Sequence, residues 1–182
     1  MNLIQAKRIL RQKIRAEMKS TPDEYFHSAG QEICRRLLAS DGYRQSQTIF
    51  CFVSHGKEPD MCPLLEQALA DGKTLCVPLC KAAGQMEVRQ IHSLDQLSPG
   101  AYGIPEPPAD SRSILPDEID LALIPCLAAT KDGRRLGKGG GYYDRFLAVY
   151  AGEAVLICPA RFLLEEIPVE EHDICLEMVL TE

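Results

Sequence analysis

A chain of 182 residues, 46% hydrophobic and 25% charged, has the composition of one globular domain with a substantial core, so we expect residues 1–182 to form a single domain and a monomer. No apolar run could cross a bilayer, and the basic N-terminus lacks the apolar segment of a signal peptide, which predicts a cytoplasmic protein with no membrane partner. The net charge of −6 argues against a nucleic-acid partner and favours small anions.

The first predicted element is a helix from Leu3 to Met18, where apolar residues recur at helical spacing and form one stripe. Beside that stripe, Lys7, Arg11 and Arg15 form a cationic row at i, i+4 and i+8. Such a row is most often a solvated face, but a row that borders a buried stripe can also face a cleft. The row is therefore a candidate phosphate-binding surface.

A second helix is predicted from Thr21 to about Ser40. The run Thr21-Pro22-Asp23-Glu24 offers an N-cap, a proline at the first helical position and an acid three residues after the cap. Asp41-Gly42 is expected to stop this helix.

The next residues have the order strand, helix, strand, which predicts a largely parallel sheet. The predicted elements are a strand at 48–54, a helix at 60–70 and a strand at 73–79. Further strands are predicted at 86–91, 121–124 and 154–158, with a Pro- and Gly-rich loop at 98–113 and a helix at 146–150. Prolines at or just beyond the ends of three of these strands mark the carboxyl rim of the sheet, where open α/β sheets bind ligands.

Eight cysteines form no CxxC pair. Cys51, Cys76 and Cys158 lie in apolar, strand-like runs, so we expect buried, free thiols in a reducing compartment. The remaining cysteines lack the spacing of a zinc site.

The segment Arg134 to Arg145 contains four glycines and four cationic side chains. Glycines let backbone N–H groups approach an anion, a following helix adds its positive end, and the cations add full charges, so the segment predicts a phosphate-binding loop. A P-loop is excluded because only three residues separate Gly133 from Gly137, and Gly139 follows the lysine. A dinucleotide fingerprint is excluded because its third glycine would fall on Tyr142. The alternative is a flexible Gly-rich turn.

Three loops should meet at the carboxyl rim: residues 54–60, residues 103–108 and the glycine-rich segment. Glu58, directly after a strand, is either a ligand for N–H groups of a heterocycle or a solvated acid. Asp144 is either a partner of the helix dipole or a magnesium ligand beside phosphates. Asp173 by itself indicates only an exposed acid. Tyr142 either stacks on an aromatic ligand or packs in the core.

Taken together, these segments resemble the 5-formyltetrahydrofolate cyclo-ligase family nearly from end to end. The resemblance is most specific in Arg-Leu-Gly-Lys-Gly-Gly-Gly-Tyr-Tyr-Asp at 135–144. Weaker matches are Ala6-Lys7-Arg8 to Arg11, Phe52-Val53-Ser54 to Glu58, Gly103-Ile104-Pro105-Glu106-Pro107, Asp120 to Pro125 and Ile167-Pro168-Val169 to Asp173.

The resemblance implies a three-layer α/β/α sandwich similar to ribose-phosphate isomerases and CoA transferases. It also implies closure of 5-formyltetrahydrofolate to 5,10-methenyltetrahydrofolate, with ATP as co-substrate, Mg²⁺ as cofactor, and release of ADP and phosphate. The reaction would pass through phosphorylation of the formyl oxygen, which needs positioning and electrostatics more than a nucleophile.

Residue roles follow from the same resemblance. Glu58, Arg135 and Tyr142 are expected to be catalytic, and Asp144 and Asp173 to bind the metal. ATP is expected to contact Lys7, Arg8, Arg11, Arg135, Leu136, Gly137, Lys138, Gly139, Gly140, Gly141, Tyr142 and Tyr143. The folate is expected to contact Val53, Glu58, Glu106, Lys138, Gly139, Gly140, Gly141 and Tyr142.

The sequence departs from the family pattern just upstream of the glycines. Members typically have Pro-Gly-x-Ala-Phe-Asp, whereas this chain has Pro125-Cys126-Leu127-Ala128-Ala129-Thr130. The alternative function is therefore a non-catalytic, regulatory homologue that binds nucleotide or folate. A sugar-phosphate isomerase, suggested by the fold analogy, would need a base–acid pair that this loop does not supply.

Overall fold

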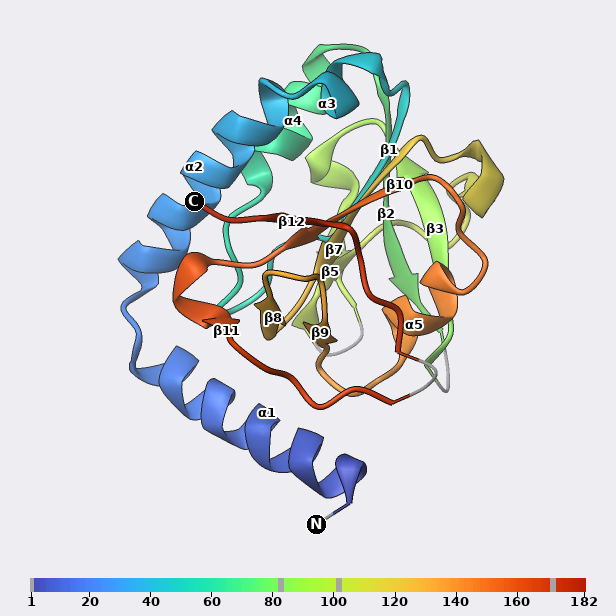
Figure 1. Cartoon of the computed structure of the whole chain (residues 1–182). Helices are drawn as coiled ribbons and strands as arrows, with labels where there is room; N and C mark the ends of the chain where they lie inside the picture. The colour runs from blue at the N-terminus through green and yellow to red at the C-terminus, as the bar shows by residue number, and fades with distance from the viewer. Residues whose placement is uncertain (1, 82–83, 101–102, 171–172) are drawn as a thin grey trace.

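The computed structural model describes residues 2–81, 84–100, 103–170 and 173–182. Its centre is a seven-stranded sheet in the order β12-β10-β7-β1-β2-β3-β6 (Figure 1). Neighbouring strands from β12 to β2 pair in parallel, whereas β3 and β6 are antiparallel, so the prediction of a largely parallel sheet is confirmed. The strands are β1 Thr48–Cys51, β2 Thr74–Cys80, β3 Met86–Ile91, β6 Ser113–Ile114, β7 Leu121–Pro125, β10 Glu153–Ile157 and β12 Met178–Leu180.

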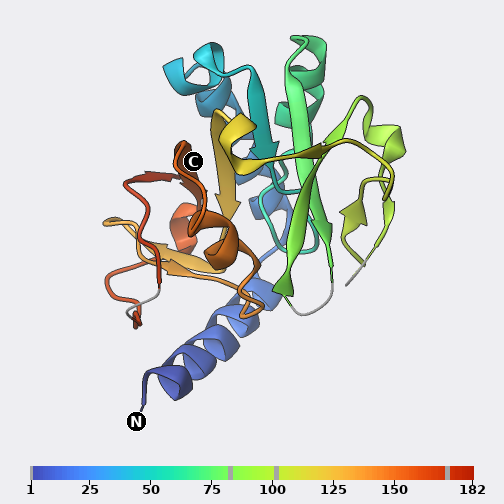
Figure 2. The same ribbon diagram turned by 90° about the vertical axis from the view of Figure 1, so that its right-hand side faces the viewer.

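Helices cover one face of this sheet, and a mixed layer covers the other (Figures 1 and 2). The first layer holds α2 Asp23–Leu38, α3 Asp41–Gln45 and α4 Cys62–Ala70. The second holds α1 Leu3–Ser20, α5 Tyr142–Leu147 and a small sheet of β11 Leu163–Leu164, β8 Ala128–Thr130 and β9 Arg135–Leu136. The predicted three-layer architecture is thus confirmed, with part of its second outer layer made of strands.

The central sheet has a hydrophobic core on each face. The alternating direction of side chains along the central strands explains both cores. In β1, Ile49 and Cys51 pack against the α2, α3 and α4 layer, whereas Phe50 packs against the opposite layer. All three side chains are fully buried. Successive side chains of a strand point to opposite faces, so a continuous apolar run fills both layers of a covered parallel sheet.

The connection between β2 and β3 explains the antiparallel edge. Cys80 and Met86 are paired residues at the hairpin end, with only five residues between them. A parallel return would need a crossover of about a dozen residues or more. The order β1, α4, β2 has that length and is parallel, as the sequence predicted.

Three helix predictions were wrong in detail. Thr21 is not the N-cap of α2, because its hydroxyl donates to Glu17 O in α1 at 2.8 Å and Pro22 takes the cap position. Asp41-Gly42 does not end α2, which already ends at Leu38. Instead, Asp41 begins the short helix α3, and Ser40 caps it by accepting from Tyr43 N at 3.1 Å. The helix predicted at 146–150 is α5 and already begins at Tyr142, directly after Gly141.

The loop predicted at 98–113 is also more ordered than expected, apart from residues 101–102, which lie outside the described part. It contains the paired strands β4 Ser98–Pro99 and β5 Pro105–Glu106, and it ends in β6. Two-residue strands carry too little periodicity to be seen in a sequence.

The cysteines are free, and Cys51, Cys76 and Cys158 are buried as predicted. Among the described residues, no helix is both long and apolar enough to span a bilayer.

Candidate active site

A cavity of about 400 Å³ lies beyond the carboxyl ends of β1, β2 and β7. Three segments meet in its wall: the loop after β1, the segment around β5, and the glycine loop, residues 137–141, with the start of α5. The predicted convergence of three loops at this rim is therefore confirmed. Its lining includes Val53, His55, Glu58, Ile104, Glu106, Cys126, Arg135, Gly137, Lys138, Gly139, Gly140, Gly141, Tyr142, Tyr143 and Asp144.

The glycine loop leaves the small outer sheet rather than the central sheet. Arg135 and Leu136 form β9, which pairs antiparallel with β8 after a tight turn. The loop then enters α5 through Gly141, whose φ of 70° is in the left-handed region, and Gly139 has a φ of 102°. These two positions require glycine because other residues rarely adopt such backbone angles. The β8–β9 hairpin therefore lies between β7 and the glycine loop, and the loop connects β9 to α5.

Helix α1 supports this loop from outside. Arg11 Nε donates to Gly137 O at 2.9 Å, and a terminal guanidinium nitrogen of Arg15 donates to Lys138 O at 2.9 Å. The cationic row of α1 therefore faces the glycine loop, which excludes the interpretation as a purely solvated face. Arg8, on another side of the helix, is exposed.

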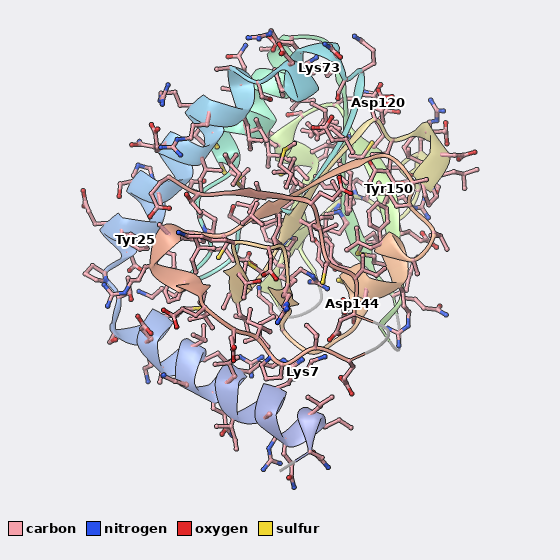
Figure 3. The ribbon with its side chains drawn as sticks, in the orientation of Figure 1. Lys7, Tyr25, Lys73, Asp120, Asp144 and Tyr150 are labelled. Atoms are coloured by element: carbon pink, nitrogen blue, oxygen red, sulfur yellow. The ribbon has the colours of Figure 1, made fainter. Side chains whose placement is uncertain are left out.

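Lys7 is the buried member of the row, with 6% of its side chain exposed. Its Nζ donates to Glu170 Oε2 at 2.8 Å and also contacts Asp173 Oδ2. Burial lowers the pKa of Lys7, but the hydrogen bonds and charges of the two carboxylates outweigh it and raise the pKa above its usual value of 10.5. Figure 3 places Lys7 between α1 and the body of the protein.

Glu58 is buried although it lies in a polar loop, with 7% of its side chain exposed. Its Oε2 accepts from His55 N at 2.9 Å, and its Oε1 lies 2.6 Å from Lys138 Nζ. Ser54 shapes the loop, because its hydroxyl donates to Pro59 O at 2.7 Å and accepts from Met61 N at 2.9 Å. The interpretation of Glu58 as a solvated acid is therefore wrong.

The guanidinium of Arg135 lies beside Gly137 of the glycine loop, with only 5% of its side chain exposed. One terminal nitrogen contacts Asp144 Oδ1 in the first turn of α5. Its Nε is buried and has no hydrogen-bond partner among the described residues. A buried donor without a partner carries a desolvation cost, which is expected where a charge-binding group is held ready.

A second buried carboxylate, Glu106, also lines the cavity, and together with Glu58 it forms what we call the acidic wall. Its Oε1 accepts from Cys80 N at 3.1 Å at the end of β2. Burial, together with the hydrogen bond and charge of Glu106, raises the pKa of the Cys80 thiol to about 11. Cys80 is therefore a neutral wall residue at physiological pH and not a nucleophile.

The implied magnesium ligands Asp144 and Asp173 each contact a cation, Arg135 and Lys7 respectively. Within the described ranges, no three His, Cys, Asp or Glu side chains converge. One or two carboxylates are nevertheless the usual protein share of a magnesium site, because phosphate oxygens and water supply the remaining ligands. Asp144, which lines the cavity, therefore fits a nucleotide-bound Mg²⁺, whereas Asp173 does not line the cavity and its place at the metal stays a prediction.

The structure brings most predicted ligand-binding residues to one cavity. The cavity is lined by Val53, Glu58, Glu106, Arg135, the glycine loop, Tyr142, Tyr143 and Asp144. The residues that do not line the cavity are Lys7, Arg8, Arg11, Leu136 and Asp173; Leu136 is a core residue of β9. Their roles stay predictions.

Several lining residues were not assigned to a ligand from the sequence. Arg15 belongs to the cationic row that was proposed as a phosphate-binding surface, but it was not assigned to the ATP site, and it borders the cavity. Phe52, Pro78, Cys80, Met86 and Ile104 also contribute. Apolar residues of this kind look the same in a sequence whether they line a cavity or fill a core.

Comparisons with known proteins agree with this geometry. The profile of the 5-formyltetrahydrofolate cyclo-ligase family matches residues 3–182. The 5-formyltetrahydrofolate cyclo-ligase of Escherichia coli K12 is 33% identical over 174 residues, which cover 92% of this chain and 96% of that protein. The one from Mycolicibacterium smegmatis is 35% identical over 144 residues, 74% of this chain and 73% of that protein.

Solved structures extend the comparison. The NMR structure of Aquifex aeolicus 5,10-methenyltetrahydrofolate synthetase superposes with a TM-score of 0.84 at 26% identity, over 95% of this chain and 88% of that one. A 5,10-methenyltetrahydrofolate synthetase from Mycoplasma pneumoniae superposes with a TM-score of 0.77 over 96% and 98% of the two chains. At 19% identity, the second comparison supports the fold alone.

Proposed function

This chain belongs to the 5-formyltetrahydrofolate cyclo-ligase family, a family of ligases in folate one-carbon metabolism, and we propose that it closes 5-formyltetrahydrofolate to 5,10-methenyltetrahydrofolate at the expense of ATP and with Mg²⁺. The observation that carries the proposal is the polarity of the cavity. One wall presents the buried carboxylates Glu58 and Glu106, and the other presents the glycine loop with Arg135 and Lys138.

The acidic wall suits the pterin. A pterin ring presents several N–H groups, and a buried carboxylate is a strong acceptor for them. His55 N fixes one oxygen of Glu58, so the carboxylate is oriented before a ligand binds. Val53 and Phe52 supply apolar surface beside it.

The cationic wall suits the triphosphate. The glycine loop allows backbone N–H groups to approach phosphate oxygens, and Arg135 adds a buried positive charge. Arg11 and Arg15 hold the carbonyls of Gly137 and Lys138, which turns these acceptors toward α1 and away from a bound anion. Asp144 and Asp173 would hold the metal, which would neutralise charge on the phosphates.

The proposed chemistry needs no protein nucleophile. The formyl oxygen attacks the γ-phosphorus and ADP leaves, which converts the formyl oxygen into part of a phosphate leaving group. The second folate nitrogen then attacks the formyl carbon, loses its proton, and phosphate departs with the former formyl oxygen. Arg135 stabilises charge on the phosphoryl oxygens, Glu58 positions the pterin, and Tyr142 covers the reacting groups at the cavity wall.

The test is direct measurement of product. Purified protein is mixed with 5-formyltetrahydrofolate, and the absorbance of methenyltetrahydrofolate is followed with ATP and Mg²⁺, and with each omitted. We expect product only when both are present. Glu58→Gln should lower kcat/KM by about two orders of magnitude if the carboxylate positions the ring, whereas Glu66→Gln, an exposed acid on α4, should not. Tight ATP binding without any product would instead favour the non-catalytic homologue.

A further inference from the structure

We propose that Lys138 couples the two substrates by exchanging partners: it pairs with Glu58 until the pterin binds that carboxylate, and it then moves to the phosphates of ATP. The inference rests on the proposed function for the identity of the ligands. It adds a role for the Lys138–Glu58 pair, which joins the glycine loop to the loop after β1, and it predicts that each substrate strengthens binding of the other.

Glu58 is the fixed member of the pair. Its side chain is 7% exposed, and His55 N holds the oxygen that Lys138 does not contact. The loop around it is braced through Ser54, which bonds both Pro59 and Met61. Because Glu58 cannot turn outward without losing these contacts, we expect a ligand that binds Glu58 Oε1 to take the place of the Lys138 ammonium, which lies 2.6 Å from that oxygen.

Lys138 is the mobile member. Its side chain is 47% exposed, so moving it leaves no cavity in the core. It lies between Gly137 and Gly139. Its backbone is held separately, because Arg15 bonds Lys138 O and Arg11 bonds Gly137 O. The side chain can therefore change partners while the glycine loop keeps its position.

The destination of Lys138 is set by the loop to which it belongs. The neighbouring glycines present the backbone that the proposed function assigns to the triphosphate, and Arg135 already contacts Asp144. Once the pterin has taken Glu58, the Lys138 ammonium lacks a carboxylate partner, and a phosphate oxygen is the strongest acceptor brought to the same loop. Coupling of two binding equilibria is reciprocal, so ATP must equally favour pterin binding.

Calorimetric titration measures this coupling directly. The β,γ-imido analogue of ATP is titrated with Mg²⁺ into the protein, alone and saturated with 5-formyltetrahydrofolate. We expect the folate to tighten binding of the analogue by about fivefold or more, within the usual range of coupling between sites. Lys131→Met, which removes an exposed lysine from the turn between β8 and β9, serves as the matched control and should keep this ratio.

Two variants should change the affinities for the two ligands in opposite directions. In Lys138→Met, the folate alone should bind more tightly because nothing competes for Glu58, while the ATP analogue binds more weakly and the coupling disappears. In Glu58→Gln, the ATP analogue alone should bind more tightly because Lys138 is already released, while the folate binds more weakly. Lys138→Arg should retain coupling, since an arginine can contact either partner.

Loss of packing alone cannot make one ligand bind more tightly. A crossed pattern, in which each variant binds one ligand more tightly and the other more weakly, therefore distinguishes the exchange of partners from structural damage. Unchanged coupling in Lys138→Met, or weaker binding of both ligands in both variants, would overturn the exchange. Turnover is assayed separately in the wild-type protein. Absence of methenyl product there would contradict the proposed function, whereas a crossed pattern of affinities would still support the exchange.

Discussion

Lys7 Nζ in α1 lies 2.8 Å from Glu170 Oε2, and this contact joins residues 163 positions apart. The same ammonium contacts Asp173, so the N-terminal helix is fastened to the segment before β12. Beyond this contact, α1 is held by Ile14 and Met18 in the core and by the bonds of Arg11 and Arg15 to the glycine loop. The buried charge of Lys7 is therefore one of several contacts that hold α1 over the loop.

Lys7→Met should destabilise the protein by roughly 1–3 kcal/mol, because two partly buried carboxylates lose their cation, although solvent at Glu170 reduces the cost. Urea denaturation measures this difference, and amide exchange in α1 should accelerate. Lys13→Met, an exposed lysine on the same helix, should change stability by less than about 0.5 kcal/mol. Equal stability of the two variants would show that the buried contact does not fasten α1.

Arg135→Gln should lower kcat by about 10²- to 10³-fold, because a charge positioned at the phosphoryl group stabilises the transition state more than the ground state. The neighbouring Arg134→Gln is the control, since Arg134 contacts Asp132 3.2 Å away at the hairpin turn. Steady-state kinetics with both substrates saturating measure the effect. A similar kcat in the two variants would remove Arg135 from the catalytic residues.

Asp144→Asn and Asp173→Asn should each raise the Mg²⁺ concentration for half-maximal activity about tenfold or more. Binding of ATP without metal should not weaken, because Arg135 loses its carboxylate partner in the first variant and Lys7 loses one of its two in the second, so each cation stays available to an anion. Asp132→Asn removes a carboxylate from the turn between β8 and β9 and should leave the Mg²⁺ requirement unchanged. If all three variants require the same Mg²⁺ concentration, neither carboxylate is a ligand.

The environment of the Tyr25 hydroxyl predicts that the folded protein loses stability at alkaline pH. Tyr25 lies in α2 near its N-terminus (Figure 3), and its hydroxyl donates to Glu182 Oε1 at 2.5 Å and accepts from Arg161 N at 3.0 Å. Burial, followed by the hydrogen bond to Glu182, raises the pKa of Tyr25 from 10.0 to about 12. The folded state thus holds this proton more tightly than the unfolded state.

The contribution of Tyr25 to stability should be complete below pH 10 and should disappear as the pH rises toward 12. The difference in unfolding free energy between the wild type and Tyr25→Phe should therefore be constant up to about pH 10 and shrink above it. Urea titrations at several pH values give this difference, which cancels the ionisation of the other residues. A difference that is independent of pH up to 12 would contradict the raised pKa.

Much of this protein follows from local sequence. Apolar runs of strand length, separated by a helix with a polar face, determine β1, α4 and β2, because a parallel pair needs a crossover between its strands. The glycines and cations at 134–145 determine a loop that favours anions, since only glycine tolerates the backbone of Gly139 and Gly141.

Tertiary structure decided the remainder, because contacts between distant segments leave no periodic signal. The sequence left Glu58 as either a ligand or a solvated acid, and only the bonds from His55 N and Lys138 show that it is buried in the cavity wall. Likewise, the spacing of Lys7, Arg11 and Arg15 predicted a cationic row, but only folding shows which partners the row meets. Sequence spacing places side chains on a common face, whereas burial and charge pairing depend on the segment that packs against that face.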